Sequence, residues 1–169
     1  RVRNHFGVNS VAQAGALGER LGCLLLQLPP SAVFDARVAA SFFAVLRRRW
    51  DGAVVCEPRH PSWFTAQAQA LLHRHRIARC AADPAPVPAA ALPDAPGMPG
   101  APAYWRWHGT PKVYYSGYDT AALQRLAAAV RSGMAAHAAS EQWVIFDNTA
   151  AGLAVPNALQ LQQLLGIDR

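Results

Sequence analysis

The chain has 169 residues, of which 52% are hydrophobic and 15% charged, and it carries a formal net charge of +6. This length and composition suit one globular domain spanning residues 1–169 and exclude a disordered chain. No apolar run reaches the roughly 20 residues of a membrane-spanning helix, so we expect a cytoplasmic protein that does not enter a membrane.

The basic charge does not by itself indicate nucleic acid. Fifteen of the sixteen cations are arginine, in a chain crowded with Ala, Gly and Pro. The arginines of residues 47–49 and 74–79 lie near predicted helix ends, where cations oppose the negative end of the helix dipole. The three cysteines lie in apolar stretches without a CxxC spacing, and this pattern predicts buried thiols in a reducing compartment.

Helix and strand patterns alternate from the start of the chain. Apolar residues at helical spacing predict a helix over residues 10–21. The continuous apolar run 23–28 then predicts a buried strand that ends at two prolines. Asp35 is a candidate N-cap for a helix that runs to about residue 49, and a turn leads into a strand over 53–57.

The same alternation continues to the end, interrupted once by a loop at residues 84–102 that contains seven prolines. The further predicted elements are helix 65–75, strand 77–83, strand 103–108, helix 120–137, strand 142–148 and helix 154–165. About five apolar strands that alternate with helices predict an α/β fold, with a parallel sheet and helices outside it.

Polar residues gather where these strands end: Gln27, Glu57, Asp83, Arg106 with His108, and Asp147 with Asn148. The C-terminal ends of parallel strands meet at one edge, and barrel enzymes build their active sites there. In residues 104–108 the alternation of a strand puts Tyr104, Arg106 and His108 on one face and two tryptophans on the other. We expect the tryptophans to pack on helices and Arg106 to find an acidic partner in Glu57 or Asp83.

Five segments, in order and spacing, resemble the YecE-like family, domain of unknown function 72. They are residues 21–31, the segment 57–63 (Glu-Pro-Arg-His-Pro-Ser-Trp), Asp83, residues 106–109 and residues 146–158. The resemblance implies a TIM-type (β/α)₈ barrel. This chain would supply its C-terminal part, without the family's first three strands, and the resemblance implies no assigned activity.

Candidate catalytic residues are Glu57, His60, His108 and Asp83. Glu57 is either a base or metal ligand, or the partner of an ion pair with Arg106 or Arg59. His60 lies in a loop before a proline, and His108 is a possible acid or base. Asp83 either caps the proline-rich loop or joins Glu57 and His108 in a metal set, for which no recognised spacing exists.

Candidate ligand-binding residues are Gln27, Arg59, Trp63, Arg106, Tyr118, Asn148 and Asn157. The arginines suit an anion. Trp63 is either a stacking platform or a packing residue, and Tyr118 either stacks on a ring or closes the mouth of the barrel. Asn148 and Asn157 either fix the last loop or contact an anion. Ser62 is expected to cap a helix or turn rather than to act as a nucleophile.

These patterns favour an enzyme of the hydrolase or isomerase type that acts on an anionic, phosphate-bearing or carbohydrate-like small molecule. No dinucleotide-binding motif indicates redox chemistry, and the sequence names neither a cofactor nor an oligomeric state. The alternative is a non-catalytic module that binds nucleic acid or a protein through Trp63, the tyrosines and the arginines.

Overall fold

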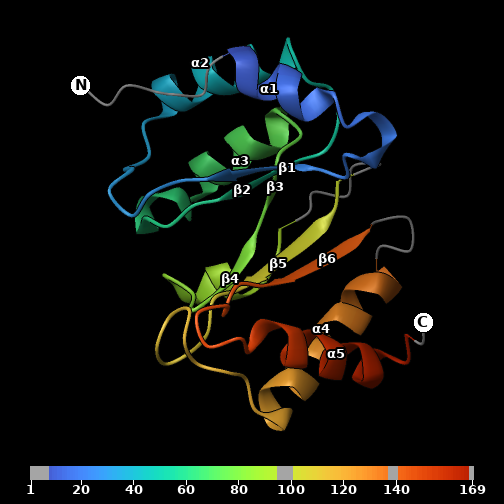
Figure 1. Ribbon diagram of the computed structural model, residues 1–169. Coiled ribbons are helices and arrows are strands. Elements are labelled where there is room, and N and C mark those ends of the chain that lie inside the picture. The colour runs from blue at the N-terminus through green and yellow to red at the C-terminus, as the bar shows by residue number, and fades with distance from the viewer. Residues whose placement is uncertain (1–7, 95–100, 137–140, 168–169) are drawn as a thin grey trace.

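The computed structural model describes residues 8–94, 101–136 and 141–167. It is an α/β fold of two parallel three-stranded sheets, with five α-helices in the described residues (Figure 1). The first sheet contains β1 (Leu24–Gln27), β2 (Val54–Glu57) and β3 (Ala78–Arg79), and the second contains β4 (Ala81–Asp83), β5 (Ala103–Trp107) and β6 (Gln142–Phe146). All neighbouring strands within each sheet are parallel.

The predicted strand over residues 77–83 is two short strands rather than one. The backbone N–H of Cys80 still donates to Cys56 O at 2.8 Å, as a continuation of the pairing with β2. From Ala81 onward the chain pairs with β5 instead. The segment therefore changes partner at Cys80 and joins the two sheets, which an apolar run alone cannot reveal.

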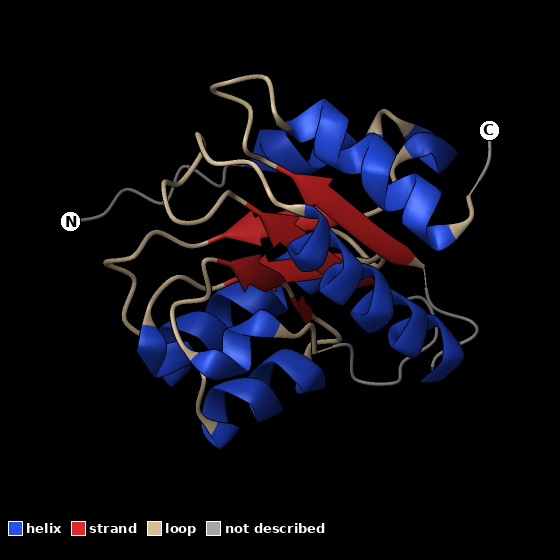
Figure 2. Cartoon of the chain, turned by 90° about the horizontal axis from the view of Figure 1, so that it is seen from below, coloured by secondary structure: helices blue, strands red, loops and turns tan. Residues whose placement is uncertain are grey.

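Helices cover the outer faces of the strands (Figure 2). In the first half these are α1 (Val8–Gly15), α2 (Ala36–Arg47) and α3 (Ala66–Arg74), and in the second half α4 (Thr120–Ala136) and α5 (Ala154–Leu165). Short 3₁₀ turns η1 (Gly18–Arg20), η2 (Pro61–Trp63) and η3 (Pro88–Ala91) lie between them. No helix in the described ranges is both long enough and apolar enough to cross a membrane.

Three groups of buried apolar side chains hold these layers. One lies between β1–β3 and helices α2 and α3, and includes Phe43 and Leu72. A second lies between β4–β6 and helices α4 and α5, and includes Trp105, as expected. The third, here named the inner core, joins the two sheets through Val55, Ala78, Cys80 and Tyr104, with Cys23, Leu25, Trp143 and Ile145 packed against it. The two sheets therefore share one apolar interior.

The predicted helix starts agree with the observed caps. Asp35 Oδ1 accepts from the N–H groups of Arg37 and Val38 at the start of α2, and Thr65 caps α3 through Ala68. At the end of α2, Arg47 donates to the backbone carbonyls of residues 50, 52, 75 and 76. This guanidinium is therefore occupied by the protein's own backbone and does not form part of a phosphate track.

The described part of the proline-rich loop contains no helix longer than η3. At Asp94 the loop is fastened to the first sheet by a bridge in which Arg79 and Asp94 exchange backbone hydrogen bonds. The Asp94 carboxylate also accepts from Gln69 and contacts His73, both on α3. Residues 95–100 of the predicted loop lie outside the described residues.

Candidate functional site

Glu57 ends β2 and lies at the centre of a polar group, here named the strand-end cluster, that also contains Gln27, Arg59, Arg106, His108 and Asp147. The Glu57 side chain is only 1% exposed. Arg59 Nη1 donates to its Oε1 at 2.5 Å, and Arg106 Nη1 donates to its Oε2 at 2.7 Å. Two guanidinium groups thus supply the paired charge that a buried carboxylate requires.

Arg106 connects Glu57 to the neighbouring strands. Its Nη1 also donates to Gln27 Oε1 at the end of β1, at 2.8 Å. Its Nη2 donates to Asp147 Oδ2, directly after β6, at 2.9 Å. The expected ion pair between Arg106 and Glu57 is therefore present, and one guanidinium of β5 holds the ends of strands from both sheets together.

His108 follows β5 and its side chain is completely buried. Nδ1 lies 3.1 Å from Asp147 Oδ2, while Nε2 lies 2.9 Å from Glu57 Oε1 and 2.8 Å from Arg59 Nη1. Because Nε2 contacts both a donor and an acceptor, a bare Nε2 accepts from Arg59 and a protonated Nε2 donates to Glu57. The tautomer of the ring therefore decides which of these two contacts is a hydrogen bond.

The electrostatics of the cluster keep Glu57 ionised. Burial opposes ionisation of this carboxyl, but hydrogen bonds from His108, Arg106 and Arg59 outweigh that cost and lower the pKa of Glu57 to about 2. A general base works best when its pKa lies near the operating pH. Glu57 is therefore better suited to anchor the arginines and the imidazole than to carry a proton.

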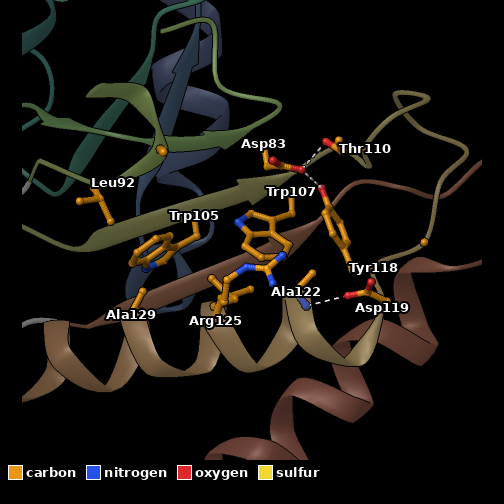
Figure 3. Close-up of a pocket in the computed structure, with 13 residues that line it drawn as sticks. Asp83, Leu92, Trp105, Trp107, Thr110, Tyr118, Asp119, Ala122, Arg125 and Ala129 are labelled. Atoms are coloured by element: carbon orange, nitrogen blue, oxygen red, sulfur yellow. Dashed lines mark hydrogen bonds between the residues drawn. The ribbon is translucent and has the colours of Figure 1, made fainter. Parts of the chain in front are cut away.

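Asp83, at the end of β4, belongs to a different group of side chains (Figure 3). Its Oδ2 accepts from Thr110 Oγ1 and from Tyr118 Oη, both at 2.6 Å. Tyr118 Oη in turn accepts from Gly109 N at 2.7 Å. Burial, reinforced by the hydrogen bond to Asp83, raises the pKa of Tyr118, so this phenol remains a neutral donor.

Asn148 and Asn157 fasten the loop between β5 and α4. Asn157, on α5, accepts from Tyr118 N at 3.1 Å and donates to Tyr118 O at 3.0 Å. Asn148 Nδ2 donates to Ser116 O and to Asn157 Oδ1. Both side chains thus fix the backbone of the loop between β5 and α4, whereas the sequence pointed to the last loop, between β6 and α5.

His60 and Trp63 make their hydrogen bonds outside the strand-end cluster. His60 caps η2, with Nδ1 accepting from Ser62 N at 3.2 Å and lying 2.8 Å from Ser62 Oγ. Trp63 is buried, packs edge-on against Phe34, and donates from Nε1 to Ala32 O. Trp63 thus packs in the interior, and His60 uses Nδ1 to cap η2.

Asp147 is the member of the cluster that the candidate set omitted. The sequence signal was present, because Asp147 follows β6 as Glu57 and His108 follow or end their own strands. Among the described residues, no three His, Cys, Asp or Glu side chains gather into a group that could hold a metal ion. Asp83 in particular is hydrogen-bonded to Thr110 and Tyr118 rather than to Glu57 or His108.

The fold and cluster define an α/β protein whose polar residues meet at the C-terminal ends of parallel strands. A family model described as "Protein of unknown function DUF72" matches residues 6–169, and the chain belongs to this DUF72 family. The resemblance seen in the sequence is thereby confirmed. No curated protein matches the chain.

Solved structures of the same family are similar. A DUF72 family protein from Thermotoga maritima has a TM-score of 0.76 and 27% identity, over 94% of this chain and 64% of that one. A DUF72 family protein from Enterococcus faecalis has a TM-score of 0.66 and 22% identity, over 86% of this chain and 58% of that one. The chain therefore spans less than two thirds of the length of these relatives.

Proposed function

We propose that the strand-end cluster is the ligand-binding floor of an enzyme of the hydrolase or isomerase type. The ligand is an anionic small molecule that bears phosphate or resembles a carbohydrate. Gln27, Arg59 and Arg106 contact the ligand. Asp147 exchanges a proton with it, and His108 positions the Asp147 carboxylate. The observation that carries the proposal is the unoccupied donor edge of Arg59.

Arg59 is held to the cluster through Nη1 alone, which contacts Glu57 and His108. Its Nε and Nη2 have no hydrogen-bond partner among the described residues, and both atoms are accessible to solvent. This Nε–Nη2 edge is the fork that pairs with both oxygens of a phosphate or carboxylate. A buried, ionised Glu57 keeps the guanidinium in place before a ligand arrives, so little ordering cost remains on binding.

Asp147 is the carboxylate best placed to touch a ligand. Its side chain is 28% exposed, and Oδ2 alone accepts hydrogen bonds, from Arg106 and His108. Oδ1 has no partner among the described residues and is not buried. We assign Asp147 the exchange of a proton with the ligand, His108 the positioning of that carboxylate, and Glu57 the anchoring of the arginines.

We further propose that the two sheets are consecutive parts of a TIM-type barrel. The strands follow one another in sequence order, β3 and β4 belong to one chain segment, and the inner core lies between the sheets. A crystal structure of the protein tests this. Further parallel strands along the free edges of β1 and β6 would agree with a barrel, and helices or solvent there would contradict it.

Titration with inorganic phosphate and with glucose 6-phosphate tests the function. Binding is followed by ³¹P nuclear magnetic resonance, and turnover by release of phosphate and by conversion to the ketose. We expect Arg59→Gln to weaken binding of both probes by about tenfold or more, since charge-assisted hydrogen bonds contribute about 1.5–3 kcal/mol. Asp147→Asn should keep binding and lose about 100-fold or more in turnover.

The control is Arg49→Gln, which removes an exposed arginine at the end of α2. It should bind both probes as the unaltered protein does. Failure of both probes to bind, or equal binding by Arg59→Gln, contradicts the anion site. Binding without either reaction contradicts the enzymatic part and supports a non-catalytic binding module.

A further inference from the structure

A cavity lies on the face of β5 that carries Trp105 and Trp107 (Figure 3). Arg106 points to the cluster, whereas Trp105 and Trp107, which alternate with it, line the cavity. The cavity measures about 470 Å³, within the range of small-molecule sites. Neither Glu57 nor His108 lines it, so it is separate from the proposed active site.

The cavity exists because one crossover lacks a long helix. Parallel strands are usually joined by a helix that packs on the sheet, but between β4 and β5 the described chain forms only the short turn η3. Proline removes backbone donors and breaks helices, and this crossover is rich in it. On this side Trp105 and Trp107 are therefore faced by α4 and by Ala91 and Leu92, with a hollow between them.

Charged groups of both signs line this hollow without neutralising one another. Within the described part of the chain, Asp83 uses only Oδ2 in hydrogen bonds, and Asp119 uses only Oδ1, which caps α4 through Ala122 N. Arg125, one turn further along α4, makes no hydrogen bond or ion pair with any described residue. Figure 3 shows its guanidinium directed from the helix toward Trp107. Two carboxylate oxygens and one guanidinium thus remain for a ligand.

We propose that this pocket binds a small amphoteric molecule that carries an amine and a carboxylate on an apolar body. The protonated amine faces Asp83 and Asp119, the carboxylate pairs with Arg125, and the body packs on Trp105 and Trp107. Aromatic walls attract both apolar surface and cations. The inference rests on the complementarity of charge around the cavity and is independent of the function proposed for the other face.

Three matched probes test the inference: L-phenylalanine, phenethylamine, which lacks the carboxylate, and 3-phenylpropionate, which lacks the amine. Binding is measured by calorimetry and by saturation-transfer nuclear magnetic resonance. We expect L-phenylalanine to bind, and each analogue to bind about threefold to tenfold more weakly, since the charged groups lie at an exposed rim. Arg125→Gln should abolish the preference over phenethylamine, and Asp119→Asn should reduce the preference over 3-phenylpropionate, because Asp83 keeps its charge.

Asparagine also caps helices, so Asp119→Asn removes the charge and keeps the helix start. Asp35→Asn, at the N-cap of α2, and Arg49→Gln are matched controls outside the pocket and should leave all three affinities unchanged. No binding of L-phenylalanine overturns the proposal. So do preferences that are undiminished in both pocket variants.

Discussion

At the scale of single residues, Glu57 is the most deeply buried carboxylate of the described residues. Three side chains contact its carboxylate: Arg59 and Arg106 donate to it, and His108 Nε2 lies 2.9 Å from Oε1. A buried ion pair adds little net stability, but removal of one partner leaves the others uncompensated and costs about 3–5 kcal/mol. The cluster therefore makes its members interdependent, and Glu57 is the residue on which the arginines depend.

Acidification should expose this dependence. The pKa of Glu57 in the folded chain, about 2, lies below its ordinary value of 4.5. Its contribution is thus complete above pH 4.5 and is lost as the pH falls toward 2, by roughly 3 kcal/mol in total. Urea unfolding between these pH values measures this loss in the unaltered protein. Glu57→Gln should be less stable at neutral pH and should lack that part of the pH dependence, whereas Glu19→Gln, at an exposed carboxylate, should retain it.

At the scale of elements, the loop between β5 and α4 decides where Tyr118 lies. The Asn157 side chain accepts from the backbone N–H of Tyr118 and donates to its backbone carbonyl, and the N–H of Gly109 donates to the Tyr118 phenol. Gly109 has φ +96°, and a Cβ there would lie 2.6 Å from Ser116 O. The loop closes on itself so tightly that only glycine fits at its first turn.

Gly109→Ala should therefore destabilise the protein by about 2 kcal/mol, because both the left-handed backbone and the contact with Ser116 are unfavourable. Gly152→Ala is the matched control, since Gly152 has φ +72° with nothing within 4 Å of the added Cβ. The difference between the two midpoints of urea unfolding isolates the steric contact. Equal effects would contradict a close approach at Gly109.

At the scale of the whole molecule, two features make one unit of the two sheets. The segment of β3 and β4 belongs to both, and the inner core takes side chains from each. Neither sheet can separate without exposing Val55, Tyr104 and their neighbours. We therefore expect the two halves to unfold together.

The rates at which the three thiols are modified can test whether the two halves unfold together. Burial raises the pKa of Cys56 and Cys80, and the thiolate is the reactive form. We expect N-ethylmaleimide to modify the half-buried Cys23 first, and Cys56 and Cys80 later at one common rate that rises with urea. Mass spectrometry of the peptides measures each rate. Faster labelling of Cys80 than of Cys56 would show that the sheets open separately.

Much of the strand-end cluster could be predicted from the sequence. Gln27, Glu57, Arg106 and His108 each end or follow an apolar strand, and the C-terminal ends of parallel strands meet. Alternation within β5 also predicted which face carries Arg106. These inferences hold because strand periodicity fixes the side on which a residue lies.

The residues between strands could not be placed in this way. His60 contacts Ser62, Trp63 packs on Phe34, and the loop residue Tyr118 donates to Asp83, which lies 35 positions earlier at the end of β4. A loop has no period, so tertiary contacts alone decide where its side chains point. The change of strand partner at Cys80 could not be predicted either, because one apolar run can pair with either neighbouring strand.

The alternation of side chains between the two faces of β5 also limits how the length of this strand can change. Inserting or deleting one residue within Ala103–Trp107 would turn the tryptophans toward the inner core and Arg106 toward α4, exchanging the linings of the two sites at once. The crossover before β5 carries no such constraint, because its residues follow no strand period. Natural variation in length should therefore accumulate in the crossover, while β5 varies only by substitution.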